Sequence, residues 1–398
     1  MRLPKTVFLS IALLPLAIVS AGAQEAQKAD TRNDKVGLLV GLLTDTSAPS
    51  EKDSSPASKY RTWWIVRDSA GAHVAAKIPD VILPRKDGFW RLGIQPTCQF
   101  RPPDKDYPED RGEIVTEDIE YAVPIQQTPE LRLDYPACDA ATQDRVFTPG
   151  YDPYATASDN DAPKECRWKK RSFTSVLPDL VSLGAAEGVR ETCDPHEREQ
   201  YSAYAQNPDD MQAHIPFGEL FGEKGNREWS RAINAELDEA DVTPEEGGWY
   251  LAHSGGQWHA VAQVQWGRYT AEDVHSANTR VLVPRSLTHS VPLPIPWDQL
   301  QKLLPGLADA YVSPGGSVLL AVQSKEDPSN HQRRIWSVSL FDLTGNKVGA
   351  KLLDLPPSGI IMVEWSTGDY VDRWTQVFSA VEKRGLPKPS LQHRDPGP

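Results

Sequence analysis

The sequence is short of cationic side chains for its size. Its 398 residues include 42 Lys and Arg against 55 Asp and Glu, which gives a formal net charge of −13 at pH 7. Proteins that bind nucleic acid draw most of their affinity from Lys and Arg that contact phosphates. The acidic balance therefore argues against a nucleic-acid partner.

Long apolar segments are also scarce. Beyond the N-terminus the best apolar run is residues 36–43, which is far shorter than the roughly 20 residues that a membrane-spanning helix needs. The chain is nevertheless 39% apolar and contains 12 Trp, which is too rich for a wholly disordered protein. We therefore expect a folded protein with no membrane span after removal of its N-terminal segment.

That N-terminal segment, residues 1–23, has the pattern of a secretory signal peptide. Arg2 and Lys5 make its start positive, residues 7–19 are mainly apolar, and residues 21–23 are a small Ala-Gly-Ala cleavage pattern. An uncleaved anchor is the alternative, although the apolar part is short for a span. Cleavage takes the net charge from −13 to −15, because both basic residues are removed. The pattern predicts a periplasmic or secreted protein.

Only four cysteines are present, Cys98, Cys138, Cys166 and Cys193. An even number in an exported chain predicts disulfide bonds, because that compartment is oxidising. Three connectivities are possible, and proximity in sequence favours Cys98–Cys138 with Cys166–Cys193. Zinc is the competing interpretation, but the chain has no CxxC or HxxxH spacing. We therefore expect no metal site and no cofactor.

Short runs of β-branched and aromatic residues, separated by turn formers, predict strands throughout the chain. Gly255-Gly256 lies between two such runs and predicts a tight hairpin. In that hairpin Ser254 faces Gln257 and His253 faces Trp258. The predicted strands are 36–43, 61–67, 88–94, 249–253, 257–266, 317–323, 335–343, 351–355 and 360–365.

Helical periodicity is limited to three segments, 227–241, 297–304 and 369–384. The last has an apolar stripe, basic residues in its final turn and Gly385 after it, which is typical of a helix C-terminus. The fold class is therefore mainly β, in a propeller-like or multi-sheet architecture with a few short helices, including a C-terminal amphipathic helix.

One order of elements recurs loosely along the chain. Asp80, Asp179 and Asp309 each precede a short apolar run and then a glycine turn, at spacings too uneven for a tandem repeat. The third copy, residues 309–345, has a Ser-Pro-Gly-Gly turn, an apolar strand, a polar loop, an Ile-Trp strand and a Gly turn. This order resembles one blade of a TolB-type β-propeller repeat, with Gly315 in place of the usual Asp. The resemblance implies a four-stranded sheet stacked around a channel and carries no activity with it.

The predicted organisation follows from these segments. A flexible leader, residues 24–34, precedes one mainly-β globular unit over 35–385, in which 98–226 is expected to be rich in loops. Residues 386–398 contain four prolines and no apolar periodicity, so we expect a disordered tail.

No catalytic signature is complete, since GxSxG, HExxH, GxxxxGK[ST] and GxGxxG are all missing. The run from His196 fails as HExxH at Gln200. His253 and His259 are predicted to point to opposite faces of their hairpin, which argues against a shared metal. The Asp-Asn-Asp run at 159–161 lacks the further oxygen ligands and the glycine of a calcium loop.

Carboxylate pairs for glycoside hydrolysis need only meet in space, so the sequence does not choose among candidates. Acids near predicted strand ends are Asp139, Asp309, Glu364 and Asp369.

Most tryptophans lie inside predicted strands, where core packing is expected. Trp168 instead adjoins the one compact basic run, residues 169–171, which suits either an anionic partner or a solvated turn. The tryptophans expected in the core are Trp63, Trp64, Trp90, Trp336 and Trp365.

The signal peptide, the β-rich pattern and the lack of a catalytic motif favour an exported, non-enzymatic binding or scaffold protein of a bacterial envelope. Its partner would be an envelope or extracellular ligand that the sequence does not name. A secreted hydrolase that acts on glycans or esters through dispersed carboxylates is the alternative. A structural part of an assembly is a third possibility, and it predicts an exposed apolar patch above about 600 Å².

Overall fold

The structure is a computed structural model that describes residues 35–43, 60–102, 112–141, 165–190, 200–236, 248–266, 275–288, 290–327 and 330–393. Several sequence predictions lie outside these residues: the signal peptide 1–23, the leader 24–34, the 159–161 run, Cys193 and His196.

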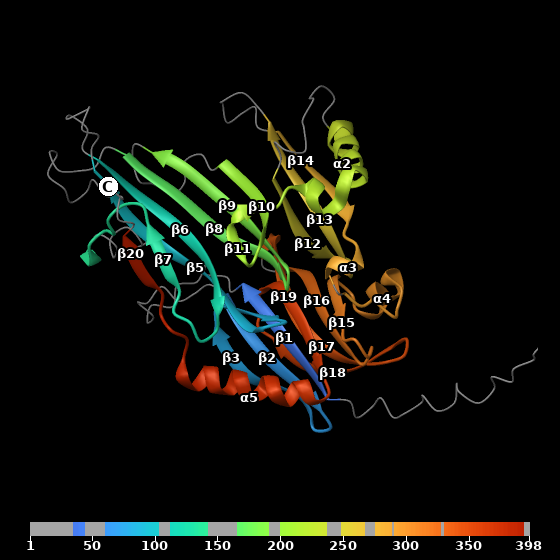
Figure 1. The fold of residues 1–398 in the computed structure, drawn as a ribbon. Coiled ribbons are helices and arrows are strands. Elements are labelled where there is room, and N and C mark those ends of the chain that lie inside the picture. Colours follow the sequence, from blue (N-terminus) through green and yellow to red (C-terminus); the bar gives the residue numbers. More distant parts are fainter. Residues whose placement is uncertain are drawn as a thin grey trace, which may run out of the picture.

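Strands dominate the described residues and are arranged in several sheets, none of which closes into a ring of strands (Figure 1). The predicted mainly-β, multi-sheet fold class is thus confirmed. Figure 1 shows the largest sheet in the upper part of the molecule with β12–β14 beside it, and the sheets around β1 and β15–β18 below.

The sheet with the order β19-β1-β2-β3 joins segments from both ends of the chain. β1, Val36–Leu43, is central in it and buried on both faces, as its unbroken apolar sequence predicts. Its neighbours are β2 (Tyr60–Asp68) and β19 (Gly359–Thr367), and β3 (Gly71–Pro79) forms the far edge. All three pairings are antiparallel.

The largest sheet has seven strands in the order β11-β10-β9-β8-β6-β5-β4. Its β6–β8 pairing is parallel, whereas its other pairings are antiparallel. The described residues of the segment 98–226, expected to be rich in loops, contribute much of this sheet. The strands are β4 Val81–Arg85, β5 Gly88–Arg101, β6 Glu113–Pro124, β8 Glu165–Leu177, β9 Leu180–Arg190, β10 Gln200–Asn207 and β11 Asp210–His214.

Two antiparallel sheets follow along the chain. In the three-stranded one, Ser254 pairs with Gln257 and His253 with Trp258, which confirms the predicted hairpin register. The strands are β12 Gly248–Ser254, β13 Gln257–Trp266, β14 His275–Leu282, then β15 Leu307–Val312, β16 Val318–Asp327, β17 Asn330–Thr344 and β18 Lys347–Leu355.

The helices lie outside the sheets. α5, Asp369–Arg384, packs against β3 and has the predicted bounds, and α4, Trp297–Leu303, ends one residue before the predicted end. α2, Phe217–Glu236, begins ten residues before the predicted start, because the chain bends at Gly222 (φ 62°) and continues as helix. Asn226, the residue before the predicted start, is therefore inside α2. A short α3, Arg285–Thr288, follows β14.

The segment after α5 differs from the predicted disordered tail. β20, Ser390–His393, pairs in parallel with β7, Glu130–Leu133, and the Ser390 N–H donates to the carbonyl of Pro129. Arg91 also donates a hydrogen bond to the carbonyl of Pro387. Residues 386–393 are therefore held by backbone and side-chain bonds, and residues 394–398 lie outside the described part.

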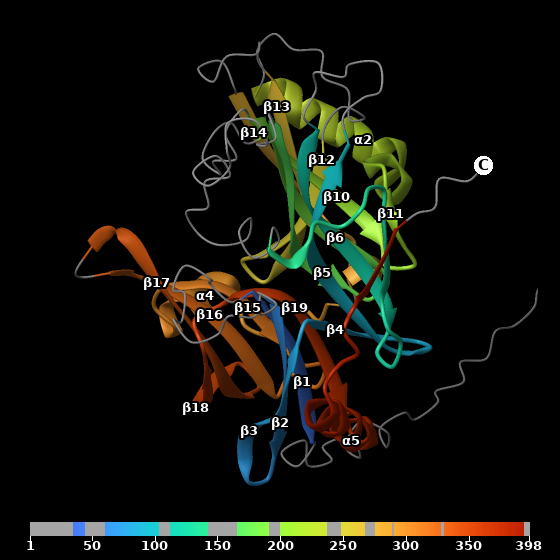
Figure 2. The ribbon, with the colours of Figure 1, turned by 90° about the vertical axis from the view of Figure 1, so that its left-hand side faces the viewer.

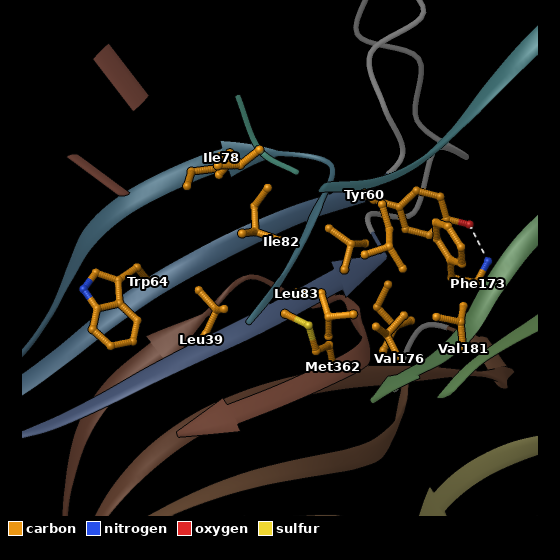
Figure 3. Packing of buried hydrophobic residues seen from close by; sticks show 14 of the residues in the cluster. Leu39, Tyr60, Trp64, Ile78, Ile82, Leu83, Phe173, Val176, Val181 and Met362 are labelled. Atoms are coloured by element: carbon orange, nitrogen blue, oxygen red, sulfur yellow. Dashed lines mark hydrogen bonds between the residues drawn. The ribbon is translucent and has the colours of Figure 1, made fainter. Parts of the chain in front are cut away.

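A core packed between the β1 sheet, the seven-stranded sheet and α5 joins the upper and lower parts of the molecule. Figure 3 shows the side chains that the strands contribute to it. The Tyr60 hydroxyl accepts a hydrogen bond from the Phe173 N–H at 2.9 Å, which links the two sheets. Burial raises the pKa of Tyr60 well above its usual value. Trp64 is fully buried against Trp374 and Phe378 of α5. β1 needs Gly37 here, because an added Cβ would lie 1.9 Å from the Trp64 ring.

The tryptophan predictions are largely confirmed. Trp64 is buried, and Trp63, Trp90 and Trp365 are partly buried against the core clusters. Trp336 is the exception, since it is 45% exposed and the prediction of a core position is wrong.

The predicted disulfide between Cys98 and Cys138 is present and packs against Ile114. It closes a loop with a sequence separation of 40, so it restricts the unfolded chain. We expect its reduction to lower the free energy of unfolding by about 2–4 kcal/mol, measured by urea unfolding with and without reductant. A C98S/C138S variant should lose a similar amount in the absence of reductant. Equal stability of the reduced and oxidised protein would contradict this.

Candidate functional site

A buried histidine and aspartate meet where the β12–β13 hairpin packs against β15. His253, near the end of β12, places its Nδ1 2.7 Å from Oδ2 of Asp309. Both side chains are largely shielded from solvent. The second oxygen, Oδ1, accepts hydrogen bonds from the N–H of Gly256 at 3.1 Å and of Ala310 at 2.9 Å. The carboxylate therefore ties the hairpin turn to the neighbouring sheet.

The Gly-Gly turn makes this contact possible. Gly256 has φ 73°, and an added Cβ would lie 2.3 Å from Cδ1 of Leu293. A side chain at this position would both strain the backbone and clash, so the turn could not bring its N–H to Asp309. The chain itself therefore requires glycine here.

Aromatic rings enclose the imidazole. The Tyr311 ring stacks on His253 with centroids 4.0 Å apart and planes inclined by 17°, and the Trp258 ring approaches edge-on at 4.9 Å. Burial raises the pKa of Tyr311 well above its usual value, and the charge of Asp309 adds to the effect. The phenol therefore stays neutral and acts as a hydrogen-bonding group.

The surroundings of His253 tie three sheets together. Two residues before His253, Ser175 donates to the Leu251 carbonyl at 2.7 Å, and the Leu251 N–H donates to the Ser182 hydroxyl at 2.8 Å. These buried bonds join β8 and β9 to β12, while Asp309 joins β12 to β15. The strand that carries His253 is thus fixed on both sides.

This arrangement resembles the base half of a catalytic triad, since a carboxylate holds Nδ1 of a histidine. Ser254, the nearest hydroxyl in sequence, lies on the opposite face of β12, because successive side chains alternate. It accepts a long hydrogen bond of 3.4 Å from Arg280. His259 pairs with Ala252, so it too lies on the other face, as the sequence predicts. The geometry therefore fits a structural role, in which Asp309 holds His253 in place, better than a catalytic role in which His253 takes a proton from a nucleophile.

A second acidic position lies on β19. Glu364 is partly buried, and burial, followed by the charge of Asp179, raises its pKa to about 8. Asp179 is in the turn between β8 and β9, and β8 packs against β19. At neutral pH the Glu364 carboxyl is therefore mainly protonated beside a negatively charged neighbour. Acids with a raised pKa occur at catalytic sites as well as at structural ones.

The raised pKa makes the stability depend on pH. Below about pH 4.5 Glu364 is protonated in both the folded and the unfolded chain, whereas between 4.5 and about 8 only the unfolded chain ionises. Stability should therefore fall as pH rises through this window. We expect Glu364→Gln to match the parent protein at pH 4 and to exceed it by at least about 1.4 kcal/mol at pH 9, which is the equivalent of one pKa unit.

Urea unfolding at pH 4, 6, 8 and 9 measures this difference. Glu130→Gln, at an exposed position of β7, is the control for the loss of one surface carboxylate. A constant difference for Glu364→Gln at all four pH values would contradict the assignment.

A third polar cluster lies between β3, β5 and β6. Oδ2 of Asp80 accepts from Nε and Nη2 of Arg91 at 2.7 and 2.6 Å, and the Tyr121 hydroxyl is 3.4 Å from the same oxygen. Both charged side chains are 7% exposed. Burial raises the pKa of Tyr121 well above its usual value, with Asp80 adding to it. This cluster fixes the turn into β4 and, through Arg91, the segment after α5.

The basic run 169–171 lies on β8 rather than in a turn. Arg171 forms ion pairs with Glu117, at 3.1 Å, and with Glu120 on the parallel strand β6, and its N–H donates to Asp118. The side chain of Trp168 is outside the described part. Arg171 is therefore bound to acidic residues of the neighbouring strand β6 within the sheet.

Two exposed apolar side chains are adjacent in sequence on the β16–β17 hairpin. Trp336 is 45% and Ile335 38% exposed, whereas Val338, two positions after Trp336, is buried. Figure 2 shows this hairpin projecting from its sheet at the left of the view. We call the part beyond Gln323 and Val338, which comprises residues 324–327 and 330–337, the β16–β17 arm.

The four acids that lie near predicted strand ends occupy different kinds of position in the structure. Asp309 and Glu364 both lie in the clusters above, whereas Asp369 is in the first turn of α5 and Asp139 follows Cys138. The recurring Asp positions, Asp80, Asp179 and Asp309, each take part in one of the three clusters. In the sequence each of these residues precedes a short apolar run and a glycine turn. That pattern drew attention to the three acids, but it did not reveal their partners Arg91, Glu364 and His253.

The described residues hold no group of three or more His, Cys, Asp and Glu side chains placed to bind a metal ion. Among the helices in this part of the chain, none has the length and apolar character needed to cross a bilayer. No protein-family model matches the chain, and a search among curated proteins finds no match either.

Proposed function

We propose that the protein is an exported, non-enzymatic binding or scaffold protein of a bacterial envelope. The observation that carries the proposal is the β16–β17 arm, which presents Trp336 and Ile335 to solvent on a strand that leaves its sheet. Exposed aromatic side chains are costly in water and are enriched where proteins bind partners. Export rests on the signal-peptide pattern of residues 1–23 and makes the periplasm or the exterior the place of binding.

Site-specific photocrosslinking tests binding through the arm. A photoreactive residue at 336, in protein produced in its native host, should give a discrete adduct in the envelope or extracellular fraction. The same residue at Tyr370, which is 61% exposed on α5, is the matched control and should not give that adduct. Identical adducts from both positions, or none from 336, would contradict the proposal.

N-terminal sequencing of the exported protein tests cleavage of the signal peptide. The sequence should begin near Gln24, and an intact Met1 would contradict export.

The architectural part of the proposal is a propeller-like arrangement. It is supported by the four-stranded antiparallel sheet β15–β18, which contains the blade-like segment 309–345, and by the pairing of β19 with β1 from the opposite end of the chain. The seven-stranded sheet departs from a four-stranded blade, so the arrangement would be an irregular one.

A second candidate function, glycoside hydrolysis, is favoured by Glu364. A carboxyl that remains protonated near pH 7 can donate a proton to a leaving oxygen, and the nearby charge of Asp179 could stabilise a cationic transition state. We expect any glycosidase activity on a panel of aryl glycosides to disappear in both Glu364→Gln and Asp179→Asn. Equal activity of both variants and the parent would remove these residues from the mechanism.

A further inference from the structure

The last strand of the described chain is paired but hardly buried. Within the described residues β20 pairs with β7 alone, and each of its four residues is half-buried or exposed, with Leu391 40% exposed. Figure 1 shows β20 beside β7, where the chain arrives after α5. A two-stranded pairing of this length has little stability of its own. β20 is therefore held mainly by backbone bonds to one neighbour.

The strand on the other side of this pairing is anchored independently. Both leucines of β7 are buried. The segment that contains β7 is also fastened to β5 at both ends. The Ile125 N–H donates to the Phe89 carbonyl at 2.9 Å, and the Cys138 N–H donates to the Cys98 carbonyl at 2.8 Å, beside the disulfide bond. β7 therefore keeps its position when β20 is absent.

A second contact on β5 is prepared in the same way. Arg91 directs Nε and Nη2 to the Asp80 carboxylate, which leaves Nη1 to donate to the carbonyl of Pro387. Both charged side chains are buried, so the ion pair fixes the guanidinium whether or not the carbonyl is present. We call the side of β7 that pairs with β20, together with Arg91, the β7 edge.

The chain between α5 and β20 has the form of an extended peptide lying along this edge. Leu386 packs partly against the main core, and prolines follow at 387 and 389. Proline favours an extended backbone and has no N–H that would need an acceptor. We call residues 386–393 the C-terminal latch. The edge is thus built into the fold, whereas the latch contributes few buried side chains.

We infer that the β7 edge is a binding site for an extended peptide and that the C-terminal latch is its built-in ligand. The latch leaves and returns while the rest of the chain stays folded, and its tethering makes the closed state predominant. In the open state the edge takes a partner segment of the same pattern, with a carbonyl for Arg91 followed by a strand parallel to β7. This site is separate from the β16–β17 arm and does not depend on the function proposed for it.

Two double variants of the full chain separate the latch from the fold. In a parallel ladder alternate residues bond to the neighbouring strand, so the N–H groups of Ser390 and Gln392 face β7. Those of Leu391 and His393 face away. S390P/Q392P removes both bonding donors, whereas L391P/H393P adds the same number of prolines where no donor is lost, and is the matched control. Circular dichroism establishes that both remain folded.

Amide exchange measures release of the latch. The Leu131 N–H of β7 donates to β20 in this ladder, and we expect it to exchange at least about tenfold faster in S390P/Q392P than in the parent. Exchange at Leu92, in the middle of β5, should not change. L391P/H393P should match the parent at both positions.

A synthetic peptide tests binding to the vacated edge. The probe is a fluorescent peptide with the sequence of residues 386–393, LPKPSLQH, and fluorescence anisotropy follows its binding to the full chain. We expect saturable binding to S390P/Q392P that is at least about tenfold tighter than binding to the parent or to L391P/H393P, in which the latch occupies the edge. Methylation of the serine and glutamine backbone nitrogens in the probe should abolish binding. Methylation at its second leucine should leave binding unchanged.

Several results would overturn the inference. Equal acceleration of exchange at Leu131 and Leu92 in S390P/Q392P would show that the latch opens only with the whole fold. No peptide binding to that variant, or equal binding of the two methylated probes, would exclude a peptide site at the β7 edge. A dimer of the parent in sedimentation experiments that is lost in S390P/Q392P would assign the edge to the latch of a second copy.

Discussion

Replacing Asp80 with asparagine should lower the free energy of unfolding by about 3–5 kcal/mol, because it leaves the Arg91 guanidinium buried without its counter-charge. Asparagine keeps the shape of the side chain and tolerates the positive φ of 67° that Asp80 adopts, so the loss reports the charge rather than the backbone. Arg91 also holds the Pro387 carbonyl. The variant should therefore loosen residues 386–393 as well, with faster amide exchange at Ser390.

Asp209→Asn is the matched control, because Asp209 forms two hydrogen bonds of 2.7 Å with Arg85 in a mostly exposed position. Solvent screens this pair, and its loss should cost no more than about 1 kcal/mol. Urea unfolding of the two variants at pH 7 measures both effects. A loss in Asp80→Asn no greater than that in Asp209→Asn would show that the buried pair does not stabilise the fold.

Replacing Trp64 with alanine should also lower the free energy of unfolding by about 3–5 kcal/mol, since the cavity would lie at the centre of the main core. The indole contacts Trp374 and Phe378 with centroids 5.4 Å away in each case, and its N–H donates to Thr375 at 2.9 Å. All three partners are on α5. The loss should therefore include weaker docking of that helix, visible as faster amide exchange over 371–381.

Trp336→Ala provides the comparison for the same change of side chain. Its indole is 45% exposed, so we expect a loss within about 1 kcal/mol and no change in exchange along α5. Similar losses in the two variants would contradict the described burial. The pair also separates stability from binding, because Trp336→Ala should impair the arm while the fold stays intact.

Local signals accounted for the elements that were predicted well. Gly255 and Gly256 both adopt positive φ, and two such residues between strand-forming runs leave little freedom in the turn, so the register of β12 and β13 followed. α5 carries its own apolar stripe and ends at Gly385 with φ 76°, so its bounds could be read from the chain. These features depend on residues a few positions apart.

The polar clusters depend on pairings that no local pattern encodes. Asp179 and Glu364 are far apart in the sequence, and His253 meets Asp309 because two sheets pack together. The pattern of Trp336 is that of a buried strand, and its exposure follows from the end of β18 on the adjacent strand. The segment after α5 looked disordered because its prolines prevent helix, yet a short parallel pairing with β7 requires only four residues.

The position of β1 in its sheet has a consequence for biosynthesis. β1 lies near the start of the chain, but one of its two neighbours, β19, is made of Gly359–Thr367 near the other end. A nascent chain that stops before Gly359 leaves one edge of the strand VGLLVGLL open to other chains. Truncation products of this protein should therefore be the species that aggregate, and completion of translation is what closes the sheet.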